Sequence, residues 1–146
     1  MVKRIAVDRC CGVIVDYQDF FLSQLEARSR YRLQANTQNF VRLLNYLRIP
    51  MIATMERPVV NKGPVPDDIK RHLGSDGKVF EKDFFDLTKE KPIRTYLKRL
   101  NKKQIIVAGC ETDVCVLQSC LGLLDIGFDV FAVEELDRKS TRLNSS

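Results

Sequence analysis

The sequence predicts an α/β fold with a central parallel β-sheet, because two kinds of segment alternate along it. Short apolar runs rich in β-branched residues recur, and longer segments with helical periodicity separate them. The runs at residues 11–16 and 104–109 are apolar almost throughout, which is typical of strands buried on both faces. Strands that alternate with helices form parallel βαβ units joined by right-handed crossovers.

Five short segments are candidate strands in this pattern. They are residues 11–16, 50–55, 78–82, 104–109 and 128–133. The fourth segment is the clearest, since it reads as a continuous buried run, and the third is the weakest. Together they predict a sheet of at least five strands.

Four segments are candidate helices, at residues 20–47, 67–73, 89–100 and 113–124. In the first, apolar side chains repeat at three- and four-residue steps from Phe40 to Leu47, and Thr37 is a candidate cap. Pro92 suits the first turn of the third helix, and Gly127 lies where the fourth would end. Residues 57–66 are dense in Pro and Gly and are predicted to be a loop.

The chain length of 146 residues suits a single domain. We assign residues 1–136 to that domain, because residues 137–146 change abruptly to a polar, unpatterned tail that we expect to be non-native or disordered. The tail carries a net charge of +2, which leaves +3 for residues 1–136 out of the total of +5. These basic residues are dispersed among acidic ones, so the sequence does not predict a nucleic-acid partner.

The amino-terminal segment does not resemble a signal peptide, because charged residues interrupt it and a small-residue cleavage site is absent. No apolar run approaches the length of a membrane span. The expected compartment is therefore the cytoplasm, and no membrane partner is expected.

The five cysteines do not form a disulfide or zinc pattern. Their number is odd and no CxxC pair occurs, which argues against both kinds of site. Cys10, Cys11 and Cys120 are expected to be small buried hydrophobic residues. Cys115 differs from them because it follows the fourth strand, at the start of a predicted helix.

The topology predicts a site at the carboxyl edge of the sheet, where open α/β sheets bind their ligands. Asp16 ends the first strand, Lys82 ends the third, and residues 109–115 join the fourth strand to its helix. A thiol must become a thiolate to act as a nucleophile. The helix dipole and Lys82 would favour the thiolate of Cys115, and Asp16 could take its proton.

Backbone amides around Glu111 and Cys115 could then bind the oxyanion of a tetrahedral intermediate. His72 is the only histidine and lies in a polar segment without a marked partner. We interpret it as a surface residue and not as the base.

Three segments resemble the isochorismatase-like cysteine hydrolases, which include nicotinamidases and N-carbamoylsarcosine amidases. Residues 12–20 resemble the family's apolar strand followed by Asp-x-Gln and Phe, and residues 79–85 its lysine followed by an aromatic residue. Residues 106–116 resemble its Gly-x-x-Thr-x-x-Cys-Val elbow. The resemblance spans roughly residues 10–135, in order.

The resemblance implies a Rossmann-like three-layer sandwich whose last helix and a sixth strand are missing here, and an oligomer at full length. It implies a catalytic triad of Asp16, Lys82 and Cys115. It also implies a cis peptide between Cys110 and Glu111 that forms the oxyanion hole. Further residues expected close to the substrate are Gln18, Phe20 and Thr112.

One departure from the nicotinamidases predicts that no metal or other cofactor is bound. Those enzymes resemble one another in an Asp-x-His segment after the second strand, which holds a metal with further histidines. The corresponding segment here is residues 54–58, Thr-Met-Glu-Arg-Pro, and the chain has a single histidine. We interpret Glu56 as a loop residue or ion-pair partner and not as an acid catalyst.

Each candidate also has a purely structural interpretation. Cys115 taken alone would be a core residue, and Asp16 could be a strand-end turn residue, although burying an unpaired acid is costly. Lys82 could be solvated surface and Thr112 a helix cap. The combination of the three segments favours catalysis.

The leading hypothesis is a cysteine hydrolase that cleaves a small amide or ureido substrate through a covalent Cys115 intermediate. The alternative is a catalytically inactive relative that serves as a binding or assembly subunit. A flavodoxin-like or nucleotide-binding protein ranks lower, because no GxGxxG or Walker loop follows the first strand.

Overall fold

The computed structural model describes residues 4–73, 78–109 and 114–133. Within them, five parallel strands form one sheet in the order β3-β2-β1-β4-β5. The strands are β1 (Cys10–Val15), β2 (Met51–Glu56), β3 (Lys78–Lys82), β4 (Gln104–Gly109) and β5 (Asp129–Ala132). All five predicted strands and the parallel sheet are confirmed.

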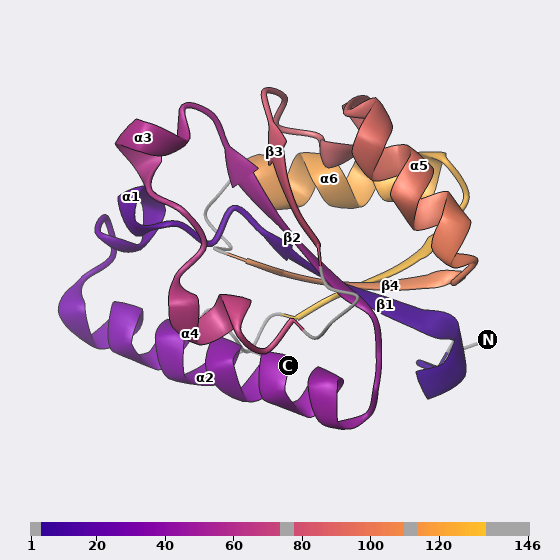
Figure 1. The fold of residues 1–146 in the computed structure, drawn as a ribbon, viewed down its shortest axis with the longest axis horizontal. Helices are drawn as coiled ribbons and strands as arrows, with labels where there is room; N and C mark the ends of the chain where they lie inside the picture. The colour runs from indigo at the N-terminus through magenta and orange to yellow at the C-terminus, as the bar shows by residue number, and fades with distance from the viewer. Residues whose placement is uncertain (1–3, 74–77, 110–113, 134–146) are drawn as a thin grey trace, which may run out of the picture.

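Helices cover both faces of this sheet, as expected for a three-layer sandwich. They are α1 (Asp19–Leu22), α2 (Ala27–Tyr46), α3 (Val59–Lys62), α4 (Asp67–Lys70), α5 (Lys91–Leu100) and α6 (Val114–Asp125), with single 3-10 turns at Val7–Arg9 and Leu87–Lys89. Figure 1 shows α2 and α4 on one side of the strands and α5 and α6 on the other. The two crossovers between β1 and β3 thus lie on one face of the sheet, and the two between β3 and β5 lie on the other.

The core consists of two apolar clusters, one on each face of the sheet. Leu33, Val41 and Leu44 of α2 belong to one cluster, and Leu97 of α5 and Leu123 of α6 belong to the other. The central strand β1 is buried along its whole length, which explains its continuous apolar sequence.

Gly12 lets α2 approach the central strand closely. A Cβ atom at this position would lie 2.5 Å from Cδ1 of Leu44. A larger residue would therefore push α2 away from the sheet.

The helix predicted at residues 20–47 is wrong as a single element, because it is broken between α1 and α2. Two side chains compete for the carbonyl oxygen of Phe20: the Ser23 hydroxyl donates to it at 3.0 Å and the Gln24 amide at 3.2 Å. Glu26 then has extended backbone angles before α2 begins. Such local side-chain bonds compete with helix propagation.

The prediction that residues 57–66 are loop throughout is also wrong, because α3 lies within them. Pro58 precedes this helix, and Gly63 ends it with a φ of 90°, a conformation that favours glycine. A single helical turn of four residues has no room for the periodicity by which a sequence predicts a helix.

Several sequence-based predictions fall on residues outside the described ranges. They concern the tail at residues 137–146, and Cys110, Glu111, Thr112 and the cis peptide between the first two of these. The domain boundary after residue 136 and the oxyanion hole therefore stay predictions. Among the helices that the structure describes, none has the length and apolar character needed to cross a membrane.

Candidate active site

The predicted triad residues meet at the carboxyl edge of the sheet. Asp16 directly follows β1, Lys82 is the last residue of β3, and Cys115 is the second residue of α6. All three are buried, with exposed fractions of 0%, 0% and 1%. Residues that lie 99 positions apart in the chain therefore share one buried cluster.

Asp16 and Lys82 form a buried ion pair. Nζ of Lys82 lies 2.7 Å from Oδ2 of Asp16, and the other carboxylate oxygen accepts a hydrogen bond of 2.8 Å from the Thr54 hydroxyl. Thr54 Oγ1 in turn accepts from the backbone N–H of Asp16 at 3.1 Å. Asp16 has a φ of 49°, and an aspartate tolerates this left-handed conformation better than most residues.

The ammonium of Lys82 is held on its other side by the chain that follows β3. It donates to the backbone oxygens of Phe84 at 2.8 Å and Phe85 at 3.4 Å. Burial disfavours the charged ammonium, but the attraction of Asp16, supported by Cys115, outweighs burial and raises the pKa of Lys82 above its ordinary value. Lys82 is therefore a fixed positive charge at neutral pH, beside the thiol.

A second ion pair lies on the opposite side of the thiol. Sγ of Cys115 donates to Oε2 of Glu56 at 3.3 Å, and Oε1 of Glu56 lies 2.5 Å from Nζ of Lys62. Burial would raise the pKa of Glu56, but hydrogen bonds from Lys62 and Cys115 outweigh burial and lower it. Glu56 is thus an ion-pair partner, as expected, but it ends β2 and touches the candidate nucleophile.

Gln18 connects the two sides of the cluster through the backbone. Its carbonyl oxygen accepts from the N–H of Glu56 at 2.8 Å, and its amide donates to the carbonyl oxygens of Gly63 at 2.8 Å and Glu56 at 3.3 Å. The side chain is fully buried. Gln18 therefore positions Glu56 and the end of α3.

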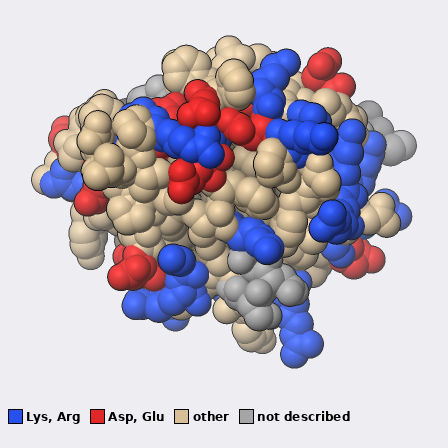
Figure 2. All heavy atoms as spheres, turned by 45° about the horizontal axis from the view of Figure 1, so that its top comes forward, with Lys and Arg blue, Asp and Glu red and all other residues tan. Residues whose placement is uncertain are grey.

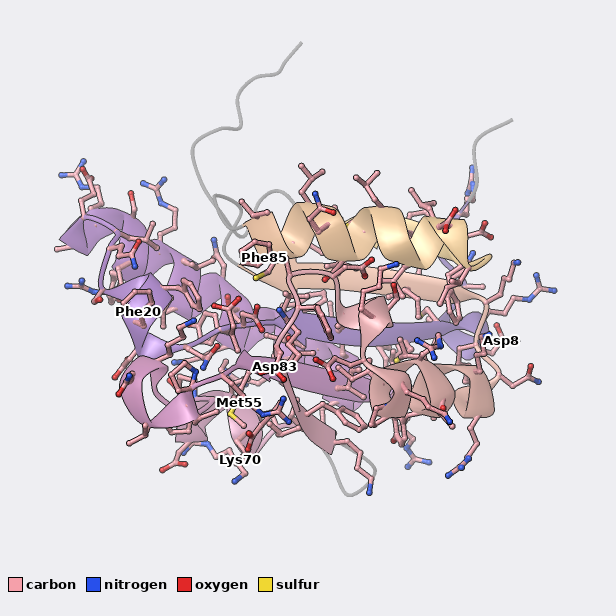
Figure 3. The ribbon with its side chains drawn as sticks, turned by 90° about the horizontal axis from the view of Figure 1, so that it is seen from above. Asp8, Phe20, Met55, Lys70, Asp83 and Phe85 are labelled. Atoms are coloured by element: carbon pink, nitrogen blue, oxygen red, sulfur yellow. The ribbon has the colours of Figure 1, made fainter. Side chains whose placement is uncertain are left out.

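Phe20 lies at the outer margin of the cluster and is 45% exposed. Its ring packs edge-to-face against Phe21, and Nζ of Lys62 lies 5.9 Å from each ring centroid. Phe20 therefore contacts the cation that binds Glu56. In Figure 3 Phe20 lies on α1, whereas Phe85 lies beside α6, and the Ser119 hydroxyl of α6 donates to the backbone oxygen of Phe85.

An open hollow of about 580 Å³ adjoins the outer side of the cluster. Its lining includes Asp19, Phe20, Arg30, Lys62 and Gly63. Lys62 therefore belongs both to the hollow and to the ion pair with Glu56. On the molecular face shown in Figure 2, acidic side chains lie beside basic ones, and further basic side chains gather toward one end.

Three potential metal ligands lie together in this cluster, so the fit of a cation can be tested. One ligand atom each from Asp16, Glu56 and Cys115 lies within 4.8 Å of the others. Both carboxylates, however, already bind an ammonium, from Lys82 and Lys62 respectively. A divalent cation would have to compete with the buried ammonium of Lys82 and the half-buried ammonium of Lys62, so these residues do not fit one well.

The Isochorismatase domain model matches residues 10–139 of the chain. The chain belongs to the isochorismatase family. The resemblance inferred from the three sequence segments is therefore confirmed. Among relatives, the secreted isochorismatase effector Isc1 of Phytophthora sojae is 33% identical over 113 residues, which are 75% of this chain and 53% of that protein.

The E. coli protein named as probable hydrolase YcaC is 28% identical over 129 residues, covering 84% of this chain and 59% of its own length. A structure of YcaC from Pseudomonas aeruginosa superposes with a TM-score of 0.86 at 24% identity, covering 98% of this chain and 71% of that one. This superposition confirms the predicted fold. The chain spans about half the length of the first curated relatives it matches.

Sequence reasoning missed three contributors to the site: Thr54, Lys62 and the contact of Glu56 with the thiol. A signal for two of them was present, because Thr54 and Glu56 are two residues apart in a strand and so point to the same face. Polar residues at that spacing near the carboxyl end of a buried strand indicate a site, as Asp16 did. Lys62 had no such signal, because its position is set by α3, a short helix within a segment that the sequence predicts to be a loop.

Proposed function

We propose that this chain carries the active site of a cysteine hydrolase that cleaves the C–N bond of a small amide or ureido substrate. The observation that carries the proposal is the buried Cys115 thiol at the start of α6, set against the Asp16–Lys82 ion pair. Membership of the isochorismatase family supports a hydrolase. The amino end of a helix and a fixed ammonium both favour a thiolate.

The proposed reaction has two stages. The Cys115 thiolate attacks the substrate carbonyl carbon, the carbonyl electrons move to oxygen, and the tetrahedral intermediate collapses with loss of the amine. A carboxylate takes the thiol proton and returns it to the leaving nitrogen; the family triad gives this task to Asp16. Water then adds to the thioester and releases the acid and the free thiol.

Lys82 stabilises the negative charge that develops on sulfur in the first stage. Its pKa is raised, so it enters the reaction protonated and does not need to gain a proton. The backbone amide of Glu111, after the expected cis peptide with Cys110, remains the proposed oxyanion donor, with Thr112 beside it. The proposed substrate margin is the hollow lined by Phe20 and Lys62.

Alkylation with iodoacetamide, followed by peptide mapping, tests the nucleophile. Burial raises the pKa of the Cys10 and Cys120 thiols and raises the pKa of Cys11 to about 12, so these three are internal controls. We expect Cys115 to be alkylated fastest at neutral pH in the folded protein. Equal or slower labelling of Cys115 would refute the assignment.

A panel of small amides and ureido compounds, assayed with wild-type protein and the Cys115→Ser variant, tests the activity. We expect turnover by the wild type with accumulation of a Cys115 acyl adduct visible by mass spectrometry, and neither with the variant. If Cys115 is alkylated fast but no panel compound is cleaved or forms an adduct, a binding subunit becomes the better assignment.

Self-association of this chain is a further part of the proposal. The outward face of α6 carries four apolar side chains that are at least half exposed: Val114, Leu117, Leu121 and Leu124. They recur at three- and four-residue steps and so form one stripe. Sedimentation is expected to show a homo-oligomer that Leu117→Lys weakens, and a monomeric wild type would contradict this.

A further inference from the structure

The segment that follows β3, residues 83–88, holds the ammonium of Lys82 through its backbone and is called the lysine loop below. Nζ of Lys82 donates to the carbonyl oxygens of Phe84 at 2.8 Å and Phe85 at 3.4 Å. An ammonium has three donor hydrogens, and its third partner is Oδ2 of Asp16, 2.7 Å away. The position of this charge beside the thiol therefore depends on where the lysine loop lies.

The aromatic side chains of the lysine loop do not anchor its backbone in the core. Phe84 and Phe85 are 53% and 55% exposed. Before them, the N–H of Asp83 donates to the Glu90 carboxylate at the exposed surface. After them, Leu87 is fully buried in the apolar cluster between the sheet and α6. The carbonyl oxygens that hold the ammonium therefore need an anchor of their own.

Ser119 of α6 supplies this anchor. Its hydroxyl donates to the carbonyl oxygen of Phe85 at 3.1 Å and accepts from the N–H of Leu87 at 3.0 Å. A serine inside a helix commonly bonds to a carbonyl oxygen of the preceding turn instead. Here the hydroxyl is buried and bonds to the lysine loop on both its donor and its acceptor side.

The carbonyl oxygen of Phe85 connects the helix to the lysine, because it accepts from both the Ser119 hydroxyl and the Lys82 ammonium. Ser119 lies four residues after Cys115 in α6, so the two buried side chains share one face of the helix. Figure 3 shows the lysine loop between Asp83, next to β3, and Phe85, beside α6. One helix thus carries the candidate nucleophile and the anchor of the cation that faces it.

Gly122 extends the same contact by one more turn of α6. A Cβ atom at this position would overlap both carboxylate oxygens of Asp86 and lie 2.5 Å from Oγ1 of Thr88, two residues of the lysine loop. Glycine is a poor helix former, but here its missing Cβ leaves the space that the loop occupies. The close approach keeps the loop within hydrogen-bond distance of Ser119.

We infer that Ser119 is a positioning residue that holds the Lys82 ammonium at the sulfur of Cys115 through the carbonyl oxygen of Phe85. This inference rests on the proposed function and leaves the proposed role of Asp16 as proton acceptor unchanged. Because Ser119 is 0% exposed, it does not touch the substrate. Its loss should weaken stabilisation of the thiolate while substrate binding stays intact.

Three charged side chains of the described residues face the sulfur of Cys115, and they determine how its reactivity depends on pH. Lys82 from β3 attracts it, Glu56 from β2 contacts it at 3.3 Å, and Asp16 from the end of β1 belongs to the same cluster. Both carboxylates disfavour a negative charge on sulfur, so the ammonium is the group that favours it. An ammonium held less closely should therefore move the reaction of the thiol to higher pH.

The test compares Ser119→Ala with Ser119→Thr, which keeps the hydroxyl, and with Thr37→Ala, which removes a buried hydroxyl from α2 on the other face of the sheet. Iodoacetamide alkylation of Cys115 is measured against pH in each protein. The Ser119→Ala curve should move to higher pH, with alkylation at neutral pH about threefold or more slower. Ser119→Thr and Thr37→Ala should follow the wild type.

Gly122→Ala disturbs the same contact independently, because the added Cβ pushes the lysine loop away from α6. Its alkylation curve should move in the same direction as that of Ser119→Ala. This second variant gives a reading even if Ser119→Ala folds poorly.

A charge-free background separates positioning of the ammonium from general loosening of the fold. The double variant Asp16→Asn with Lys82→Met has no ammonium for the loop to hold. Adding Ser119→Ala to it should leave the alkylation curve of Cys115 unmoved. A merely structural role for Ser119 would move the curve in both backgrounds.

Hydrolysis of the amide that the wild type cleaves fastest is the second readout. Ser119→Ala should lose about tenfold in kcat, while KM changes by less than about twofold. Ser119→Thr should recover most of the lost kcat. A change confined to KM would place Ser119 in substrate binding and overturn the inference.

The inference is also overturned if the Ser119→Ala curve coincides with that of the wild type, or if its shift persists in the charge-free background. Failure of the proposed function looks different: the wild-type Cys115 is then not preferentially alkylated, and no amide is cleaved. If only the amide panel fails, the alkylation curves still decide the role of Ser119.

Discussion

Removing the ammonium of Lys82 should strongly destabilise the fold, because it leaves the Asp16 carboxylate buried without its counter-ion. Both side chains are 0% exposed and lie 2.7 Å apart. At this distance and an effective dielectric constant of about 20, the attraction of two unit charges is about 6 kcal/mol. Part of this offsets the desolvation of the two ions.

Breaking such a buried pair from one side costs about 3–5 kcal/mol in measured cases. We expect Lys82→Met to lose about that much of the free energy of unfolding, with Asp16 left with the Thr54 hydroxyl. Domains of this kind have a total of about 5–15 kcal/mol, so the loss is a large share. The double variant, Lys82→Met with Asp16→Asn, should lose less of the free energy of unfolding than the sum of the losses in the two single variants.

Urea unfolding followed by far-ultraviolet circular dichroism measures the four free energies of this double-mutant cycle. Arg57→Met is the control, because Arg57 pairs with Glu81 and Asp83 at the exposed surface, where water screens the charges. The reasoning would be refuted by a Lys82→Met loss as small as that of the control. Additive single losses would equally show that the pair is not coupled.

Three further predictions concern the residues around this pair. Gly109→Ala places a Cβ atom 2.6 Å from the backbone oxygen of Val15 and should cost about 1–3 kcal/mol in chemical unfolding; an unchanged midpoint would show that the strands can separate there. Thr54→Val removes the hydroxyl bonded to Asp16 and should cost about 1–3 kcal/mol by the same assay, whereas a neutral effect would mean that the carboxylate finds another donor. The lowered pKa of Glu56 means that its ion pair contributes stability above the ordinary pKa of 4.5, and that this contribution is lost as the pH falls through the lowered value. The melting temperature should therefore fall less steeply from pH 6 downward for Glu56→Gln than for the wild type. Parallel curves would show that the ion pair of Glu56 with Lys62 does not stabilise the fold.

Most of the sheet and the meeting of Asp16, Lys82 and Cys115 at one edge could be predicted from the sequence, because each leaves a strong local signal. Residues 104–109 can only be a buried strand, since every position is apolar or small except the first. Asp16 and Lys82 end strands, and in a parallel sheet strand ends meet at one edge. The order β3-β2-β1-β4-β5 then brings both to the same cluster as Cys115.

The second ion pair was decided by tertiary structure alone. Lys62 reaches Glu56 only because the chain turns after β2, forms the single turn of α3 and ends it at Gly63. Four helical residues carry no periodic signal, so a Pro- and Gly-rich segment predicts loop. The direction of the Glu56 side chain depends on its place at the end of β2, beside a helix nearly sixty residues further along.

The sequence by itself predicted the family, the parallel sheet and the candidate nucleophile, because these follow from strand composition and from motifs at strand ends. Only the tertiary structure showed which carboxylate the thiol of Cys115 faces. The physical reason is that a 3.3 Å contact between Cys115 and Glu56 depends on packing across the sheet edge. The local sequence encodes the helices and strands, but the distances between their side chains are set only when these elements pack together.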